Sequence, residues 1–395
     1  MTPLRLLFLK ERMAWPRASG HDVHTFYLMQ ALAAQGHAVA LATIDEPDPR
    51  AILDAGLADH FCFQNNDIPP TAVLSLSKWE EKFRNYWGVD VDAIRWLGDC
   101  AAAFRADAVV VSGLRVLPYV GALPAGTKAV WYAADEWVWH HLSQVSLFRR
   151  STWGELRQAF DKGLYERAYR QRLDCVWVVS AKDARAFRRF AGIRKVDVLP
   201  NGVDAVHYAP GDEAELPHSC VFWGRLDFGP NLQALQWFIR NVWPRLRSQQ
   251  PAARFDVFGF QPTPEAVALC KAEGVTLTAD EPDIRAAVRR RQVVVLPFTS
   301  GGGIKNKLLE AAAMARPIVG TPRTVEGLNG APPLPVAKTP AAFAEAVLGL
   351  WKDATARAAL GRASRAWVLQ HHTWTAAATT AAQGLGFDPQ SAGVT

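Results

Sequence analysis

The residues best suited to binding an anion lie in one segment, Val293–Thr321, which reads VVVLPFTSGGGIKNKLLEAAAMARPIVGT. Its apolar, β-branched start predicts a buried parallel strand over Val293–Phe298, and Ile318–Gly320 opens a second strand. Between them, glycines at 301–303 allow a sharp turn that exposes backbone N–H groups, and a helix is expected to start near Ile304. A glycine loop that leads into a helix N-terminus forms a cradle for phosphate.

The charged residues of this predicted helix fit the same chemistry. Lys305 and Lys307 fall in its first turn, where each cation opposes the helix dipole at a cost of up to ~1 kcal/mol. A bound anion would reverse that cost. Glu310 lies one turn after Lys307 and off the core face, where it can accept hydrogen bonds from ribose hydroxyls. Residue chemistry alone leaves an alternative open, in which a glycine turn is followed by solvated lysines and a Lys307–Glu310 surface pair.

A carboxylate pair follows another predicted strand, Ala129–Tyr132. Asp135 lies in the loop Ala-Ala-Asp-Glu-Trp, and loops at strand ends carry the chemistry of open α/β sheets. A carboxylate there can orient an acceptor hydroxyl or support positive charge that develops during a reaction. Capping of the next helix by Asp135 is the alternative, and it requires no catalysis.

Length and composition predict a two-domain globular enzyme. The chain has 395 residues, of which 49% are hydrophobic and 21% are charged. The net charge of +6 is spread among acidic residues, so it suits an anionic substrate or an anionic membrane surface without requiring either. Because the chain has no basic tract and no recognised nucleic-acid module, we expect no nucleic-acid partner.

The cysteines, the metal-binding motifs and the targeting signals bear on the cellular location and on bound metal. The five cysteines are scattered without a Cys-x-x-Cys motif, which is typical of reduced core thiols. The one Asp-x-Asp, Asp90 to Asp92, lies in an aromatic-rich stretch rather than after a strand, so we expect no bound metal. The first residues do not read as a signal peptide, and no run of apolar residues is long enough to span a membrane. We therefore expect a cytoplasmic protein.

Both halves of the chain alternate predicted strands and helices. The first half opens with a strand at Leu4–Leu9, a helix at His21–Gln35 and a strand at His37–Ala42, as a doubly wound sheet does. We place the domain boundary in the polar, Pro-flanked stretch that begins at about Pro210. The predicted domains are therefore residues 1–210 and 211–370, followed by a tail at 371–395 that we expect to be disordered from Gln383.

Two helical stretches, one aromatic-rich and one Arg-rich, leave open whether they also bind a membrane surface. Lys78–Trp96 alternates aromatic and charged residues, and Trp153–Leu173 is a long, Arg-rich amphipathic helix. We interpret them as core-packed and solvated helices, respectively. Peripheral association with an anionic membrane surface is the alternative.

The segment Val293–Thr321 resembles the donor-binding segment of the retaining glycosyltransferases of family 4. The phrase VDVLPNGVDAVHYAP at 196–210 is similar to the segment that leads into the hinge of these enzymes, and Gly224-Arg225 matches their diphosphate clamp. Glu310 matches the second of two glutamates in the family pattern, whereas the first falls at Gly302 and is missing. The usual lysine after Gly224-Arg225 is also absent.

This resemblance implies an α/β protein with the GT-B fold, in which two doubly wound Rossmann-like domains face each other across a cleft. The first domain would bind the acceptor and the second a nucleotide sugar, and the end of the chain would pack back on the first domain. The resemblance also implies that Glu310 holds the ribose and that Arg225 binds the diphosphate through its planar fork. An Arg225–Asp227 pair within the loop is the alternative.

From residues and resemblance together we derive a predicted site. We assign catalytic roles to Asp135, Arg225 and Lys307. The predicted donor-binding residues are Gly20, Gly224, Arg225, Gly301, Gly302, Gly303, Ile304, Lys305, Lys307, Leu308 and Glu310.

The implied activity is transfer of a sugar from a nucleoside-diphosphate sugar, UDP- or GDP-linked, to a hydroxyl of a glycan, lipid-linked or small-molecule acceptor. Such a reaction would retain configuration, use no metal or other cofactor, and serve polysaccharide or cell-surface glycan biosynthesis. Two alternatives remain open. A nucleotide-sugar 2-epimerase shares this fold, and a non-catalytic partner subunit of a polysaccharide synthase would account for the missing glutamate.

Overall fold

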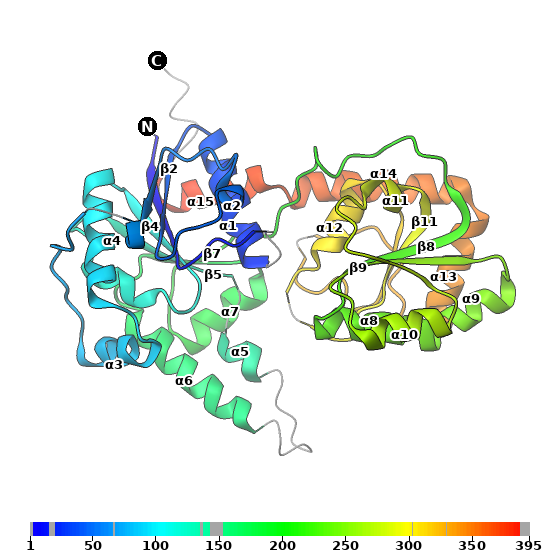
Figure 1. Cartoon of the computed structure of the whole chain (residues 1–395), viewed down its shortest axis with the longest axis horizontal. Coiled ribbons are helices and arrows are strands. Elements are labelled where there is room, and N and C mark those ends of the chain that lie inside the picture. The colour runs from blue at the N-terminus through cyan, green and yellow to red at the C-terminus, as the bar shows by residue number, and fades with distance from the viewer. Residues whose placement is uncertain are drawn as a thin grey trace. The chain divides into compact units, whose positions relative to one another are not determined.

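The computed structural model describes residues 3–15, 20–65, 68–134, 137–142, 153–301, 303–328 and 330–387. The chain forms two compact units (Figure 1). Unit 1 comprises Met1–Pro200 together with Trp374–Thr395, and unit 2 comprises Asn201–Thr373. The division therefore lies ten residues before the expected boundary at 210, because Val203 already pairs with Thr373 and packs into the core of unit 2.

Unit 1 is built on a parallel sheet of seven strands in the order β3-β2-β1-β4-β5-β6-β7, counted over the described residues. The strands are β1 (Arg5–Lys10), β2 (Ala38–Thr43), β3 (Asp59–Cys62), β4 (Ala108–Ser112), β5 (Lys128–Ala134), β6 (Cys175–Val178) and β7 (Val196–Val198). The central strands are almost entirely apolar because helices cover both faces of the sheet. β3 was not predicted, since its sequence DHFC carries little strand signal.

The helices of unit 1 alternate with these strands. They are α1 (Gly20–Ala34), α2 (Pro49–Ile52), α3 (Lys78–Trp87), α4 (Val91–Phe104), α5 (Trp137–Leu142), α6 (Gly154–Tyr169), α7 (Ala181–Phe190) and α15 (Trp374–Gly384), with short 3-10 turns η1 (Phe63–Asn65) and η2 (Leu117–Ala122). The single helix expected over Lys78–Trp96 is thus two helices. Gly88 ends the first in the left-handed conformation (φ +63°), and Asp90 caps the second.

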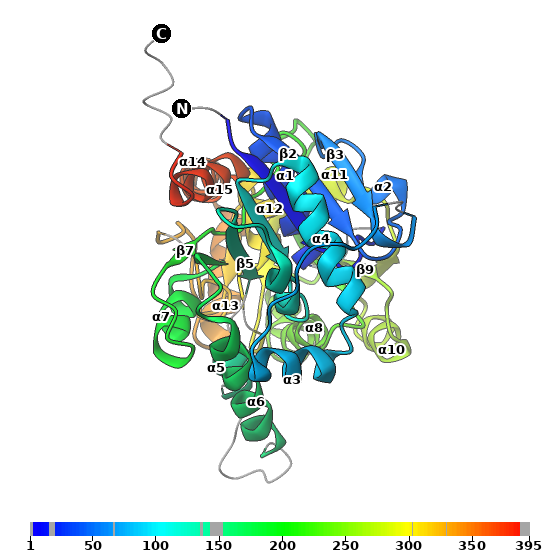
Figure 2. The ribbon, with the colours of Figure 1, turned by 90° about the vertical axis from the view of Figure 1, so that its left-hand side faces the viewer.

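α15, the last helix within the described residues, belongs to unit 1. It packs on α1 (Figures 1 and 2), and the side chain of Gln35, the residue after α1, donates to the Thr375 carbonyl at 2.9 Å. Leu385 and Ala382 are buried in the same hydrophobic cluster as β1. The expectation of disorder from Gln383 is therefore wrong as far as Phe387, because apolar contacts with the sheet order this stretch.

Unit 2 repeats the architecture with five parallel strands in the order β10-β9-β8-β11-β12, counted over the described residues. The strands are β8 (Leu216–Arg225), β9 (Arg254–Phe260), β10 (Thr276–Ala279), β11 (Arg291–Leu296) and β12 (Ile318–Gly320). The helices are α8 (Gly229–Asn241), α9 (Trp243–Gln249), α10 (Pro264–Ala272), α11 (Arg285–Arg289), α12 (Asn306–Ala313), α13 (Pro340–Lys352) and α14 (Ala354–His371).

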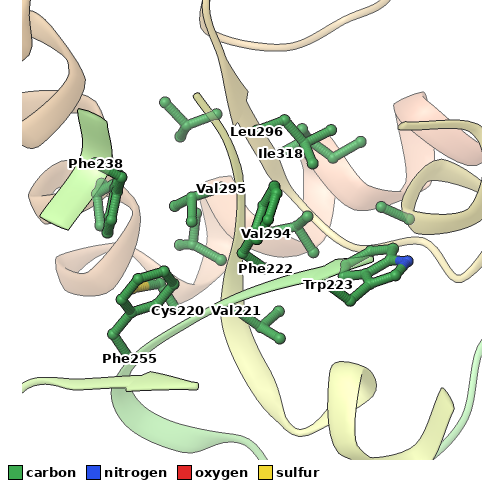
Figure 3. Packing of buried hydrophobic residues seen from close by; sticks show 14 of the residues in the cluster. Cys220, Val221, Phe222, Trp223, Phe238, Phe255, Val294, Val295, Leu296 and Ile318 are labelled. Atoms are coloured by element: carbon green, nitrogen blue, oxygen red, sulfur yellow. The ribbon is translucent and has the colours of Figure 1, made fainter. Parts of the chain in front are cut away.

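The core of unit 2 forms between β8, β11 and the helices that cover them. Figure 3 shows Phe222, Val294 and Val295 among its buried side chains, with Phe238 and Phe255 in contact at a ring distance of 4.7 Å. This packing fixes the ends of β8 and β11, from which the loops discussed below extend. Among the described residues, no helix has the length and apolar character needed to cross a membrane.

Candidate active site

Each sheet has one point where the strand order reverses. In unit 2 it lies between β8 and β11, and in unit 1 between β1 and β4. Open α/β sheets bind their ligands at the carboxyl ends of the strands on either side of such a point, because the connecting loops diverge there. Both groups of residues described below lie at these two positions.

The glycine loop of unit 2 follows β11 and leads into α12. Gly301 (φ +87°) and Gly303 (φ +69°) adopt left-handed conformations that glycine tolerates best. Helix α12 begins at Asn306, two residues later than expected, because Lys305 is its extended N-cap residue. The Lys305 ammonium donates to the carbonyls of Gly301 at 2.9 Å and Gly303 at 3.1 Å. Lys305 therefore holds the loop in shape rather than projecting from the first helical turn.

Lys307 lies in the first turn of α12 and points at the end of β8. A Cβ atom at Gly224 would come within 2.4 Å of Lys307 Cε and 2.7 Å of Lys307 Nζ. Gly224 also has φ +138°, a backbone conformation that residues with side chains rarely adopt. Its conformation and the space that the ammonium occupies therefore both require glycine at this position. The predicted pair Gly224 and Lys307 is thus brought into direct contact.

Glu310 lies one turn later and faces Trp223, the residue before Gly224. The indole Nε1 of Trp223 donates to Glu310 Oε2 at 2.8 Å. Figure 3 shows Trp223 at the edge of the core cluster. Burial raises the pKa of Glu310, whereas Lys307 and the indole hydrogen bond oppose that rise. Burial likewise lowers the pKa of Lys307, and Glu310 opposes that fall. Each charged group thus favours the charged state of the other.

Arg225 is paired within its own loop. Its Nε and a terminal nitrogen donate to the two carboxylate oxygens of Asp227 at 3.0 and 2.5 Å. Both side chains are partly exposed. The loop pair that the sequence left open is therefore present, and a phosphate would have to compete with Asp227 for the guanidinium.

The other predicted donor-binding residues differ in their surroundings. Ile304 packs against the core of unit 2, and Leu308 is fully buried in it, so their side chains are structural. Gly302 and Asp135 lie outside the described residues. Gly20 is the first residue of α1 in unit 1.

The strand ends of unit 1 carry a compact polar cluster around the first turns of α1. Lys10, the last residue of β1, forms a buried salt bridge with Asp22 at 2.5 Å. His24 Nδ1 and the Tyr132 hydroxyl lie 2.5 Å apart. The next residue along α1 is Thr25, whose Oγ1 lies 2.8 Å from Ser112 Oγ at the end of β4 and donates a hydrogen bond to the His21 carbonyl.

His21 lies in this cluster with its ring stacked on Tyr132 at a centroid distance of 6.0 Å. Burial, together with the charge of Lys10, lowers the pKa of His21 from 6.5 to about 4, although Asp22 and a hydrogen bond to the Tyr132 backbone oppose the fall. His21 is therefore neutral at physiological pH. Gly113 faces the ring, and a Cβ atom there would lie 3.6 Å from Cε1.

Among the described residues, no three His, Cys, Asp or Glu side chains are grouped so as to hold a metal ion. The one Asp-x-Asp motif has a local function, because the Asp90 carboxylate accepts a hydrogen bond from the Asp92 backbone as the cap of α4.

Several contacts of both sites were not anticipated from the sequence. The sequence analysis did not single out Trp223, although a tryptophan at the carboxyl end of a buried strand has an N–H that needs an acceptor. The Lys10–Asp22 and His24–Tyr132 pairs join residues far apart along the chain, and no local pattern marks them.

The family comparisons agree with the two-unit architecture. Residues 18–207 match the family described as Glycosyltransferase Family 4. Residues 217–353 match the family described as Glycosyl transferases group 1. The two matches do not overlap, and each corresponds closely to one unit. No curated protein sequence matches the chain.

Solved structures match nearly the whole chain at low sequence identity. HepE of Anabaena, solved with UDP and glucose, is 14% identical with a TM-score of 0.65, covering 97% of this chain and 99% of its own. Sucrose-phosphate synthase of Thermosynechococcus elongatus has the same identity and TM-score, with 96% and 98% coverage.

A variant of S. aureus TarM, solved with fondaparinux, α-GlcNAc-glycerol and UDP, is 9% identical with a TM-score of 0.69 and covers 97% of this chain and 100% of its own. At such identities these likenesses establish the fold. Together with the two family matches, they place the chain among the glycosyltransferases of the GT-B fold.

Proposed function

We infer that the protein transfers a sugar from a nucleoside-diphosphate sugar to a hydroxyl group of a glycan or lipid-linked acceptor. Unit 2 would hold the donor and unit 1 the acceptor. The observation that carries this proposal is the contact of Lys307 with Gly224 beside the Glu310–Trp223 pair, at the switch point of the second sheet. There, an ammonium, a helix N-terminus and a half-buried carboxylate lie within one turn of each other.

These groups suit the two polar parts of a nucleoside diphosphate. The start of α12, where no side chain caps the backbone N–H groups and where Lys307 lies, complements a diphosphate. Glu310 complements hydroxyls, because a carboxylate accepts hydrogen bonds and cannot donate them when charged. HepE and TarM are both described as complexes with UDP, which makes a UDP-sugar the first donor to test, with a GDP-sugar as the second.

The same arrangement supports a metal-independent departure of the diphosphate. Lys307 and the helix dipole can neutralise charge that develops on the leaving group, and Arg225 can join them if it exchanges Asp227 for phosphate. We extend the proposal to retention of configuration, in which the leaving phosphate takes the acceptor's proton. Proton NMR of the anomeric product decides this point directly.

The first experiment is a thermal-shift series with UDP, GDP, ADP and dTDP, each with and without magnesium. A nucleotide at a hundred times its dissociation constant stabilises its site by ~2.7 kcal/mol, which is a shift of a few degrees. One nucleotide that stabilises the protein without magnesium supports the proposal. Stabilisation only with magnesium contradicts metal independence.

A variant that removes one charge tests whether the nucleotide that stabilises the protein binds beside Lys307. Lys307→Met keeps the aliphatic stem and removes the ammonium that faces Gly224, so the nucleotide shift is expected to disappear. Lys271→Met, at the exposed end of α10, is the matched control and is expected to keep the shift. An unchanged shift in Lys307→Met contradicts the assignment of the donor site.

Assays with and without acceptor separate the remaining functions. An epimerase converts the nucleotide sugar without any acceptor, whereas a non-catalytic partner subunit catalyses neither this conversion nor the transfer of sugar to an acceptor.

Peripheral membrane association is a separate part of the proposal. It rests on Trp79, Tyr86 and Phe160, which are more than half exposed on the adjacent helices α3 and α6. Vesicle co-sedimentation tests it.

A further inference from the structure

Helix α12 carries Lys307 as its second residue, yet no side chain of its own holds the start of this helix. It has eight residues, and its N-cap residue, Lys305, forms no side-chain cap. The first turn of a short helix frays when nothing caps it, because its leading backbone N–H groups have no partner within the helix. The contact of the Lys307 ammonium with Gly224 therefore needs a support from outside the helix.

The side chain of Asn201 provides such a support. Its Nδ2 donates to Oδ1 of Asn306, the first residue of α12, at 2.7 Å. If both amides were turned round, the bond would run from Asn306 to Asn201 and would still join the same two side chains. Asn201 is only 6% exposed, so it can hold Asn306 in one place rather than follow its movement.

The backbone of Asn201 is itself fixed. His372 Nδ1 donates to the Asn201 carbonyl at 2.9 Å, and His372 is fully buried after the end of α14, which packs on α12 (Figure 1). The Val203 N–H donates to the His372 carbonyl at 3.0 Å, and Val203 pairs with Thr373. The chain enters unit 2 at Asn201 and leaves it at Thr373. The start of α12 is thus tied to the place where these two ends of unit 2 lie side by side.

The stability of unit 2 does not by itself explain an amide at position 201. Its Oδ1 is buried, and among the described residues no group hydrogen-bonds to it. A buried acceptor without a partner loses the free energy of its hydration, whereas an apolar side chain of similar shape would lose none. The bond to Asn306, and its consequence for Lys307 on the next residue, is the better explanation.

We propose that Asn201 is a positioning residue for the nucleotide-sugar donor. It fixes Asn306, and through Asn306 it fixes the first turn of α12 and the Lys307 ammonium that complements the diphosphate. Asn201 acts through these two residues and does not contact the substrate. This inference rests on the proposed function, and it adds a residue that the donor contacts alone would not reveal.

Variants of the full chain that remove the bond test the proposal. Asn201→Ala and Asn306→Ala each remove it from one side, and the double variant removes both partners. We expect the dissociation constant of UDP, measured by calorimetry, to rise about fivefold in each single variant and no further in the double variant, since one bond is lost in all three. An unchanged affinity in either single variant overturns the proposal, and so does a loss of about 25-fold in the double variant, which would mean two independent effects.

A second pair of variants separates positioning from stability. Asn201→Leu combined with Asn306→Ala replaces both polar partners by apolar groups, so the melting temperature is expected to stay at or above that of the wild type while UDP affinity still falls about fivefold. Gln292→Ala is the matched control. Gln292 is a buried amide, 7% exposed, near the amino end of β11, and its Oε1 accepts from the His218 N–H at 2.8 Å.

The control is expected to lower the melting temperature and to leave UDP affinity unchanged. If UDP affinity falls only in step with the melting temperature across all these variants, Asn201 has a structural role alone and the proposal is overturned.

Hydrogen exchange of the free protein separates this inference from the proposed function. In Asn201→Ala we expect the backbone N–H groups of α12 to exchange about fivefold faster and those of α13 to exchange at the wild-type rate. Wild-type exchange in α12 overturns the proposal. If no nucleotide stabilises the wild-type protein, the proposed function fails, and this measurement still decides whether Asn201 holds the start of α12.

Discussion

Single residues of the proposed donor site are placed by direct contacts between β8 and α12. Lys307 can approach the end of β8 only because position 224 has no side chain, and Glu310 is held by the indole of Trp223. The sequence indicated Gly224, Lys307 and Glu310 as a group. It could not indicate Trp223 as a partner of Glu310, because that bond depends on how β8 and α12 are placed across the core.

We expect Gly224→Ala to weaken nucleotide binding. The added methyl group would collide with Lys307 Cε and Nζ, and the backbone at φ +138° strains any side chain. The ammonium would move from its position, and we expect UDP affinity measured by calorimetry to fall at least tenfold. Gly229→Ala, where a Cβ atom meets nothing within 4 Å, should leave affinity unchanged. Equal affinity in both variants would show that Lys307 does not need its present position.

Trp223→Phe tests the support of Glu310. The ring volume is largely kept while the N–H donor to Glu310 is lost, so the protein should lose about 1–2 kcal/mol of stability and bind nucleotide more weakly. Trp351→Phe loses a similar bond, from Nε1 to the Ser219 carbonyl at 3.1 Å, far along the strand from the site. It should show the same loss of melting temperature with normal nucleotide binding. If both variants bind UDP alike, Trp223 has only a structural role.

Elements were predicted best where apolar runs or glycines mark them. One strand beside each switch point, β1 and β11, was recognised, since their buried residues are nearly continuous in sequence. The start of α12 was misplaced because Lys305 resembles a helical residue until its ammonium is seen to bind the loop carbonyls. α15 was missed because its small residues, mostly Ala and Thr, give a weak periodic signal.

α15 is predicted to stabilise unit 1 mainly through Trp374. This side chain stacks on Tyr27 at 5.5 Å and contacts His24 edge-on at 5.1 Å. Trp374→Ala should cost about 3–5 kcal/mol, since it leaves a large cavity between α1 and α15. Hydrogen exchange should show loss of protection in β1 and α1 and unchanged protection in β8 and β11. A uniform loss across both units would contradict the assignment of α15 to unit 1.

Across the whole molecule, the division into two units and the parallel sheets follow from the alternation of strands and helices. The sequence placed the boundary in the polar stretch that begins at about Pro210, whereas the structure places it at Pro200, because Val203 already pairs with Thr373 of unit 2. The histidines of unit 1 give the molecule a further property. Burial lowers the pKa of His21, His37 and His60, so each resists protonation in the folded state.

Unit 1 should therefore lose stability on mild acidification. Below pH 6.5 the unfolded chain binds more protons at these histidines than the folded chain, so stability falls as the pH drops and is constant above that value. For His21, with a folded pKa of about 4, the free energy of unfolding that is lost once the pH falls below that pKa is about 3 kcal/mol. Hydrogen exchange of β1 and β2 at pH 7 and pH 5 measures it. His21→Asn should reduce the difference, and an unchanged difference would contradict the lowered pKa.

The return of α15 to unit 1 means that unit 2 is inserted within unit 1 along the chain. During synthesis, all of unit 2 leaves the ribosome before the segment that completes the first sheet's helical cover. Unit 2 can thus finish folding while α1 and β1 still expose the apolar surface that α15 will bury. A nascent chain stalled after residue 373 should therefore carry a native unit 2 and a chaperone-sensitive unit 1, reversing the usual N-terminal-first order of folding.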